Sequence, residues 1–358
     1  MKINGDMLTL AREYRGLTQE QAATMFGCAQ STVAKIEGGI KSDIEDQYAT
    51  VISERLGFPL EFFQQPEELL GFGSSAYFYR KRATIPAAER KKVHSTVNLL
   101  RIAVKKILPH VEIKPTRALP RLSVEEYDND ASKVARALRA FWNMPDGPVK
   151  DLTALVESAG VLVIACDFGT RAIDATSLRL ADMPPLIFMN QFVPGDRWRY
   201  TLAHELAHLV MHDVPHEFME QEADLFAAEL LVPAAELKPQ LLKIGTLRLQ
   251  DLAPLKRYWR VSMQMLIMSA KRIGTLSDQK AGQLFALMSK YNLRTQEPEP
   301  IARETPSNFR RMVEALTGPL QFSESDLMQL VKWGRAELER FFSWAQPAEI
   351  HRGLRLVS

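Results

Sequence analysis

The sequence predicts a multidomain protein that is mainly α-helical, with one small β-sheet. Three observations point to this class. The chain has 358 residues, a length typical of two or three domains. Apolar residues recur at helical spacing in several segments, for example at Val93, Val97, Leu100 and Val104. The branched apolar runs that indicate strands are short and fall together, within residues 161–190.

Two short helices around a glycine turn are predicted near the amino terminus. Thr18 and Gln21 have the spacing of a capping box, so a helix should begin here and run to Phe26. A turn at residues 27–29 follows, and a second helix spans residues 30–37, where two glycines end it. This order is typical of a helix-turn-helix, whose second helix enters the DNA major groove.

The second helix offers polar side chains for DNA and apolar ones for the core. Val33 and Ile36 are expected to face inward. The residues expected to touch bases or phosphates are Gln19, Gln30, Ser31, Thr32 and Lys35. The alternative is an amino-terminal domain that binds protein, including a second copy of itself as a homodimer.

Charge is unevenly distributed over the first third of the chain. Residues 1–70 hold six basic and eleven acidic residues, a net charge of −5, which is the wrong sign for attracting phosphate. Residues 80–117 hold eleven basic and two acidic residues, a net charge of +9. Our hypothesis is that this basic segment, which includes Arg90, Lys91 and Lys92, supplies most of the phosphate contact. The alternative is the solvated face of an amphipathic connector, and the sequence favours neither.

The middle of the chain is predicted to combine helices with three short strands. Helices are expected at residues 132–142 and 151–158, and strands at residues 161–165, 177–180 and 186–190. The sheet should pack on the helix that follows it, and its edge could hold an extended peptide by strand addition. Arg179 and Asn190 near that edge could bind peptide backbone, although we favour a structural role for each.

The next segment reads His204-Glu205-Leu206-Ala207-His208 and is flanked by good helix formers. On a helix, residues four apart lie one turn above each other on the same face. Both imidazoles can then bind one metal ion, with Glu205 beside it as a general base. His204 and His208 are therefore expected metal ligands, and Glu205 is the expected catalytic residue. The competing interpretation is a helix that carries two histidines by chance.

A third ligand is expected on the following helix, predicted at residues 217–232. Glu220 and Asp224 share one stripe with two alanines, whose small side chains permit close packing on the preceding helix. Glu220 is the expected third metal ligand, and Asp224 is expected to hydrogen-bond the far nitrogen of a ligand histidine. Glu222, about 160° away around the helix, is the alternative ligand. A solvated acidic face is the alternative to any metal role.

Two further histidines follow the expected ligands. Three ligands on one straight helix, ending at His212, would span about 12 Å of helix rise, which is too far for one ion. His212 is therefore expected to pack or to support a ligand. His216 falls in the turn beyond it, and with Tyr200 it is a weak candidate for stabilising a tetrahedral oxyanion.

The carboxyl-terminal third carries no chemical motif. Residues 247–259 and 262–273 should form two helices, with Ser262 as a cap, and either make a second helix-turn-helix-like module or buttress the metal domain. The run Met263, Met265, Leu266, Ile267 and Met268 favours the buttress. Residues 294–306 are polar and rich in proline, which predicts a loop. Helices are expected again at residues 308–316 and 325–342.

The composition of the chain indicates the cellular compartment in which we expect it. The formal net charge of +2 is unremarkable. The two cysteines, Cys28 and Cys166, are far apart in sequence and fit no ligand spacing, which favours a reducing interior. Neither a signal peptide nor an apolar run of membrane-spanning length is evident, so we expect a soluble, cytoplasmic protein that does not bind membranes.

Residues 187–233 resemble the ImmA/IrrE family of zinc metallopeptidases, within the broader HExxH…E group. The resemblance is carried by PLIFMN at 185–190, RYTLAHELAHLVMH at 199–212 and EQEADLFAAELLVP at 220–233. It implies metal on His204, His208 and Glu220, with Glu205 as general base, and the cleavage of a partner transcriptional repressor. One departure is Ala207, where glycine is usual. Alanine is small and a better helix former, so no loss of function is expected.

Residues 1–70 resemble the XRE/Cro repressor class, through the two helices and the sequence LGFPLEFF at 56–63. Four regions are therefore predicted. They are an XRE-type helix-turn-helix domain (1–70), a basic helical connector (71–120), an α+β HExxH metallopeptidase domain (121–240) and a carboxyl-terminal helical region (241–358).

The sequence thus predicts a DNA-binding regulator fused to a zinc endopeptidase, with Mn²⁺ as an alternative to Zn²⁺ and a repressor protein as the expected substrate. Two other interpretations stay open. The first is a non-proteolytic transcription factor or antitoxin that uses the metal fold as a sensor or scaffold. The second is a metal-dependent hydrolase that acts on something other than protein.

Overall fold

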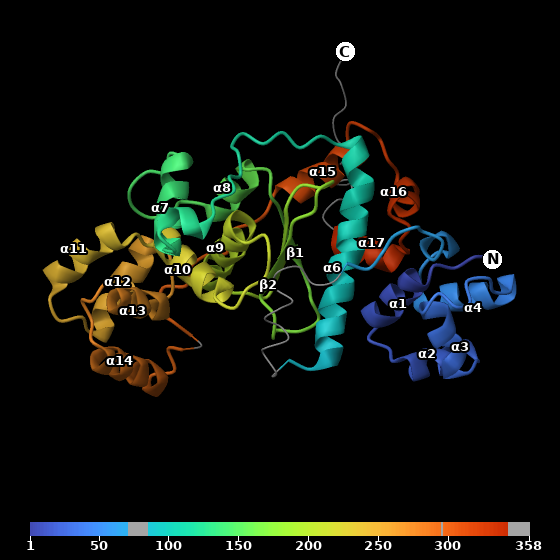
Figure 1. Ribbon diagram of the computed structural model, residues 1–358, viewed down its shortest axis with the longest axis horizontal. Helices are drawn as coiled ribbons and strands as arrows, with labels where there is room; N and C mark the ends of the chain where they lie inside the picture. The colour runs from blue at the N-terminus through green and yellow to red at the C-terminus, as the bar shows by residue number, and fades with distance from the viewer. Residues whose placement is uncertain (71–84, 295, 343–358) are drawn as a thin grey trace, which may run out of the picture.

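The computed structural model describes residues 1–70, 85–294 and 296–342 of the chain (Figure 1). It is mainly α-helical with one three-stranded sheet, which confirms the predicted class. The α-helices are α1 (Gly5–Tyr14), α2 (Gln19–Phe26), α3 (Gln30–Glu37), α4 (Asp46–Leu56), α6 (Ala87–Ile107), α7 (Ala131–Phe141), α8 (Leu152–Ser158), α9 (Gly195–Met211), α10 (Met219–Leu231), α11 (Ala234–Ile244), α12 (Leu249–Trp259), α13 (Met263–Arg272), α14 (Asp278–Lys290), α15 (Asn308–Thr317), α16 (Glu324–Val331) and α17 (Arg335–Phe342). The 3-10 helices are η1 (Leu60–Phe62), η2 (Leu108–His110) and η3 (Val124–Tyr127), and the strands are β1 (Leu162–Cys166), β2 (Ala175–Leu178) and β3 (Leu186–Asn190). None of the described helices has the length and apolar character needed to cross a membrane.

Local capping explains where the amino-terminal helices begin and end. At the start of α2, the Thr18 hydroxyl accepts a hydrogen bond from the Gln21 backbone at 3.1 Å, and the Gln21 side chain accepts one from the Thr18 backbone at 2.8 Å. This is the predicted capping box. Helix α2 ends at Gly27, whose φ of 72° suits a residue without a Cβ atom. Val33 and Ile36 of α3 are buried, as predicted.

Helix α6 is the central element of the first core, and Figure 1 shows it standing between the amino-terminal helices and the sheet. Most of its length is buried, because α1 and α16 pack against it. Two of its basic residues form ion pairs with acidic residues of the amino-terminal domain. Lys91 Nζ lies 3.0 Å from Glu13 Oε1, and Lys105 Nζ lies 3.1 Å from Glu67 Oε2. Part of the opposite charge of residues 1–70 and 80–117 is therefore neutralised by ion pairs within the chain. The basic residues at positions 80–82 lie outside the described residues.

The sheet has the order β1-β3-β2, with β1 parallel and β2 antiparallel to β3. All three predicted strands are present, although β1 is displaced by one residue and β2 by two from their predicted bounds. Leu162 and Ile164 belong to the core that contains α6 and α15, whereas Val163 and Ile187 belong to the core that contains α8 and α9. Because side chains alternate along each strand, the sheet forms a layer with helices on both faces (Figure 1).

Two apolar cores organise the described residues. The first joins α1–α4, α6, one face of the sheet and α15–α17, and it extends from Ile3 to Phe342. The second joins α7–α14 and the opposite face of the sheet. The first core crosses all three predicted boundaries, at residues 70, 120 and 240, and the second core crosses the boundary at residue 240. The predicted regions therefore share apolar cores, and none of them encloses a core of its own among the described residues.

Helices α12 and α13 pack inside the second core. The Ser262 hydroxyl accepts a hydrogen bond from the Met265 backbone at 3.1 Å, so Ser262 caps α13 as predicted. Met263, Met265 and Ile267 are buried. These contacts support the interpretation of the two helices as a buttress of the metal domain.

Residues 325–342, predicted as one helix, form two. Helix α16 ends at Val331, the capping residue Lys332 has a positive φ of 58°, and α17 begins at Arg335. Between them Trp333 is buried, and Gly334 packs so closely on Gly57 that a Cβ atom would lie 2.6 Å from the Gly57 carbonyl oxygen. The single-helix prediction was wrong because packing against the amino-terminal domain breaks the helix.

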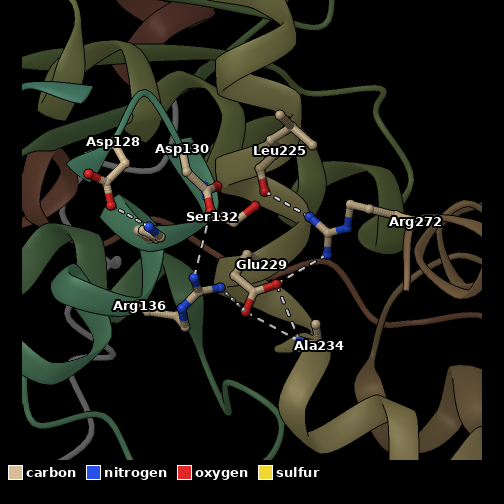
Figure 2. A network of polar contacts seen from close by, with 9 residues as sticks. Asp128, Asp130, Ser132, Arg136, Leu225, Glu229, Ala234 and Arg272 are labelled. Carbon is tan, nitrogen blue, oxygen red and sulfur yellow. Dashed lines mark hydrogen bonds and ion pairs between the residues drawn. The ribbon is translucent and has the colours of Figure 1, made fainter. Parts of the chain in front are cut away.

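A polar network around Glu229 fixes α10 (Figure 2). The Glu229 side chain is only 1% exposed. It accepts hydrogen bonds from Arg136 of α7 at 3.0 Å and from Arg272 of α13 at 3.3 Å, and from the backbone of Ala234 at the start of α11. Arg272 also donates to the Leu225 carbonyl at 3.1 Å. Because a buried carboxylate is costly unless it is paired, this network holds α10 in one position against three neighbouring helices.

A strap of residues 296–307 covers the start of α9. Glu304 is buried and accepts a hydrogen bond from the Thr153 backbone at 2.8 Å, and it forms an ion pair with Arg199 of α9. At Gly195, the first residue of α9, an added Cβ atom would overlap the carbonyl oxygen of Ile301. The strap therefore fixes the end of α9 that precedes the HExxH sequence.

Candidate metal centre

The structure brings the three predicted metal ligands together. The Nε2 atoms of His204 and His208 lie 3.1 Å apart on one face of α9. Helix α10 approaches closely, because Ala223 and Ala227 on its facing stripe are fully buried. As a result, Glu220 places one carboxylate oxygen 3.4 Å from His204 Nε2 and the other 3.3 Å from His208 Nε2.

These separations fit a divalent metal ion. Zinc bonds of about 2.0–2.2 Å at tetrahedral angles separate two ligand atoms by about 3.3–3.5 Å. The three observed separations are 3.1–3.4 Å. Two imidazoles and one carboxylate also form the ligand set of catalytic zinc sites that keep a position for water. The side chains of His204 and Glu220 are 16% and 26% exposed, so solvent reaches the site.

Asp224 contacts His204, the first candidate ligand. Its Oδ1 atom lies 2.9 Å from His204 Nδ1, on the ring edge opposite Glu220. The same oxygen accepts a hydrogen bond from the Tyr200 hydroxyl at 2.8 Å. This is the position predicted for Asp224. The sequence analysis missed the bond from Tyr200, although the spacing of four residues between Tyr200 and His204 places both side chains on one face of α9.

Glu205 is 5% exposed, and its Oε2 atom has no hydrogen-bond partner among the described residues. A buried, unpartnered carboxylate oxygen is costly and calls for an explanation. A group that must accept a proton from water needs such an available oxygen. The position of Glu205, next in sequence to His204, is consistent with the predicted role.

His212 and Glu222 extend the site away from His204. His212 Nδ1 lies 2.8 Å from His208 Nδ1, and His212 Nε2 lies 2.9 Å from Glu222 Oε2. His216 Nε2 lies 3.5 Å from the same Glu222 oxygen. Glu222, the alternative ligand, thus contacts the two later histidines, as its place on the other side of α10 requires.

Electrostatics within the metal-free site follow from these contacts. Burial alone would lower the pKa of His204, but hydrogen bonds to Asp224 and Glu220 outweigh it and raise this pKa to about 10. Burial alone would raise the pKa of Glu220, but hydrogen bonds from His204 and His208 hold it well below its ordinary value. Burial, followed by the charges of neighbouring histidines, lowers the pKa of His212 to about 3. His204 is therefore cationic at neutral pH in the absence of metal, and His212 is neutral.

A cavity of about 1000 Å³ adjoins the site on the side of Asp224. Helices α9, α10 and α13 and the strap line it. Tyr200 and Asp224 lie at its border with the candidate metal ligands, and Leu225, Met265 and Met268 contribute apolar surface.

The predicted peptide-binding residues differ in their surroundings. The side-chain nitrogen of Asn190 donates to the carbonyl oxygens of Thr170 and Ile173 at 2.7 and 2.9 Å, so Asn190 ties a loop to the sheet. This is the structural role favoured for it. Arg179 follows β2, and its Nε atom is buried with no hydrogen-bond partner within the part of the chain that the structure describes.

The candidate DNA-contacting residues form a connected surface on α2 and α3. Gln30 donates to Gln19 at 2.7 Å, and Gln19 donates to Glu37 at 2.7 Å. Glu37 is itself paired with Arg12 of α1 at 2.5 Å. The two glutamines are thus held in place from the domain interior. Ser31 and Lys35 are exposed on α3, and Thr32 is half-buried.

Two family models match the chain. Residues 8–63 match the model described as helix-turn-helix, and residues 156–271 match the model described as IrrE N-terminal-like domain, of the peptidase M78 group. No curated protein matches the chain. The second match begins in α8 and ends in α13, so it contains every residue of the candidate metal centre. The chain therefore contains one region similar to helix-turn-helix domains and another similar to the IrrE N-terminal-like domain of the peptidase M78 group.

Proposed function

We propose that the protein is a DNA-binding transcriptional regulator that is also a metal-dependent endopeptidase, and that its substrate is a partner repressor. One observation carries the enzymatic part of the proposal. Two imidazole nitrogens and a carboxylate converge with the separations of a tetrahedral site, beside a glutamate whose buried oxygen is unpartnered among the described residues.

The residues of the site divide the chemistry between them. His204, His208 and Glu220 would hold the metal. A bound Zn²⁺ or Mn²⁺ would polarise a peptide carbonyl and make nearby water more acidic. Glu205 would take a proton from the attacking water and give it to the leaving amine. Asp224 would keep His204 in the tautomer that leaves Nε2 available as a ligand.

The cavity beside Asp224 offers a place for a substrate side chain. It borders the candidate ligands, and its surface is mainly apolar, with the methionines of α13 on one side. Flexible methionine side chains adapt to different apolar groups. We therefore propose that an apolar side chain of the repressor, next to the bond that is cleaved, occupies this cavity.

Replacing Glu205 with glutamine tests the proposal. The purified protein, loaded with Zn²⁺ or Mn²⁺, is mixed with the repressor encoded nearest its gene and with a proteome-derived peptide library, and new termini are identified by mass spectrometry. The wild-type protein should produce defined fragments. Glu205→Gln should keep its metal and its DNA binding but lose cleavage. Glu217→Gln, which changes an exposed glutamate, serves as the matched control and should cleave normally.

Absence of cleavage by the metal-loaded wild-type protein, from both the repressor and the library, would overturn the enzymatic proposal. The non-proteolytic sensor or scaffold would then be the better account. Equal cleavage by wild-type protein and Glu205→Gln would instead exclude Glu205 as the base.

A further inference from the structure

We propose that His212, His216 and Glu222 form a second metal site, and that metal bound there competes with metal at His204, His208 and Glu220. The second trio has the same ligand types as the first, two imidazole nitrogens and a carboxylate. In each trio the ligand atoms all lie within 4.8 Å of one another, and no other group in the described part of the chain meets this criterion. We call His204, His208 and Glu220 the inner site and the second trio the outer site.

The geometry of the outer site suits a bound cation. Glu222 Oε2 lies 2.9 Å from His212 Nε2 and 3.5 Å from His216 Nε2, so a single oxygen faces both imidazole nitrogens. These separations bracket the distance of about 3.3–3.5 Å between two ligands of tetrahedral zinc. A small shift of His216, the exposed member of the trio, would complete the site.

The outer site is also accessible. The side chains of His212 and Glu222 are 1% and 16% exposed, whereas that of His216 is 41% exposed. His216 lies in the turn between α9 and α10, outside both helices. A cation from solvent can therefore reach the site on the side of His216, and water can supply its remaining ligands.

One hydrogen bond joins the two sites. His208 Nδ1 and His212 Nδ1 lie 2.8 Å apart, so exactly one hydrogen atom must lie between these two nitrogens. If His208 binds metal through Nε2, its Nδ1 carries the hydrogen and donates it to His212. Neutral His212 then carries its own hydrogen on Nε2, where it donates to Glu222 and cannot bind metal.

The reverse holds when the outer site is filled. Metal on His212 Nε2 moves the hydrogen of His212 to Nδ1, which then donates to His208 Nδ1. Neutral His208 must carry its hydrogen on Nε2, the atom that faces Glu220, and the inner site loses a ligand. Filling both sites would place two N–H groups against each other at 2.8 Å, which is unfavourable. Metal at either site is therefore expected to weaken the binding of a second ion at the other site, by the same factor in both directions.

Metal binding itself tests this inference, and activity is not needed. Equilibrium dialysis against Zn²⁺, followed by elemental analysis, measures the number of ions and their affinities. The wild-type protein should bind one ion tightly and a second with lower affinity. His204→Ala removes an inner ligand but keeps the bond between His208 and His212, so its single remaining ion should bind the outer site about tenfold or more tighter than the second ion binds wild-type protein.

Two further variants complete the experiment. His216→Ala should remove the weaker ion and leave the tight one, whereas His110→Ala, which changes an exposed histidine of η2, should leave both. The double variant His204→Ala/His216→Ala should bind neither. The proposal is wrong if His216→Ala retains two ions, or if the second ion binds wild-type protein as tightly as the single ion binds His204→Ala. The competition rests on the proposed metal at the inner site. Metal binding to the outer site of His204→Ala does not depend on proteolysis. Failure of the outer-site proposal is therefore distinguishable from failure of the endopeptidase proposal.

Discussion

Asp224 Oδ1 and His204 Nδ1 lie 2.9 Å apart, and this contact decides which ring nitrogen of His204 faces Glu220. In the neutral form of the ring, a carboxylate that accepts the Nδ1 hydrogen leaves Nε2 with a lone pair. Tyr200 donates to the same oxygen and so holds Asp224 in place. The relationship joins α9 and α10 at the point where the candidate ligands meet.

Replacing Asp224 with alanine should therefore weaken Zn²⁺ binding by roughly 10–100-fold, because the ring of His204 loses its orienting partner. Competition with a chromophoric chelator measures the affinity. Tyr200→Phe removes one hydrogen bond to Asp224 but leaves the bond to His204, so its effect should be smaller. Equal affinity for wild-type protein and Asp224→Ala would show that His204 is oriented by other contacts.

The stability of the metal-free protein should depend on pH through His204 and Glu220. The folded pKa of His204, at about 10, lies above its ordinary value of 6.5, so its stabilising contribution is complete below pH 6.5 and is lost as pH rises towards 10. The pKa of Glu220 is depressed, so its contribution is complete above its ordinary value of 4.5 and is lost as pH falls. Urea unfolding in the presence of a chelator should thus show a loss of stability from pH 7 to 10 that His204→Gln abolishes. An alkaline loss of the same size in both proteins would contradict this assignment.

Gly195→Ala tests the strap. A Cβ atom at residue 195 would overlap the Ile301 carbonyl oxygen, so either the strap or the start of α9 must move. Overpacking of this kind costs about 1–3 kcal/mol of unfolding free energy. Gly282→Ala is the matched control, because Gly282 lies within α14 with no atom near its Cβ position, and alanine there should stabilise the helix by about 0.5–1 kcal/mol. Denaturant titration of both variants gives the comparison, and a neutral Gly195→Ala would show that the strap yields without cost.

Glu337→Gln tests the contact between the carboxyl-terminal helices and the amino-terminal domain. The side chain of Glu337 in α17 is 1% exposed, and its Oε1 atom lies 2.6 Å from Nη1 of Arg15. Loss of this charged partner should lower the free energy of unfolding by about 2 kcal/mol. Glu324→Gln alters the more exposed pair with Arg335 and should change stability by less than about 0.5 kcal/mol. Similar stabilities for the two variants would show that the buried pair contributes little.

DNA binding should depend on salt through the basic start of α6 as well as through α3. Replacing Arg90, Lys91 and Lys92 with glutamine should flatten the dependence of affinity on salt, because each lost phosphate contact removes about 0.9 from the logarithmic slope. Lys91 already contacts Glu13, so the decrease should be smaller than three full contacts would give. Lys35→Ala should reduce the slope by about one. Fluorescence anisotropy with duplex DNA at several salt concentrations measures both, and an unchanged slope in the triple variant would assign the segment to folding alone.

Local signals in the sequence predicted the elements whose ends are set by neighbouring residues. The helix at residues 30–37 and the strand at residues 186–190 have the predicted bounds, and Thr18 and Ser262 cap helices as expected. Within the candidate site, helical spacing alone placed Glu220 and Asp224 beside the two histidines. These relationships depend on a few residues along one or two helices, so periodicity suffices to find them.

Long-range contacts account for what the sequence did not show. The strap was predicted as a loop from its prolines, but its composition does not reveal that Glu304 pairs with Arg199, 105 residues earlier in the chain. The break before α17 depends on Gly57 at the other end of the protein. The tautomers of His208 and His212 likewise depend on a distance that only the folded chain fixes.

The shared first core has a mechanical consequence. Since Ile3 and Phe342 lie in one apolar cluster, the amino-terminal helices are packed against the carboxyl-terminal helices and against one face of the sheet. A change that loosens α15–α17 would therefore also loosen the core on which α2 and α3 rest. The affinity of the amino-terminal region for DNA and the stability of the carboxyl-terminal helices are thus expected to change together.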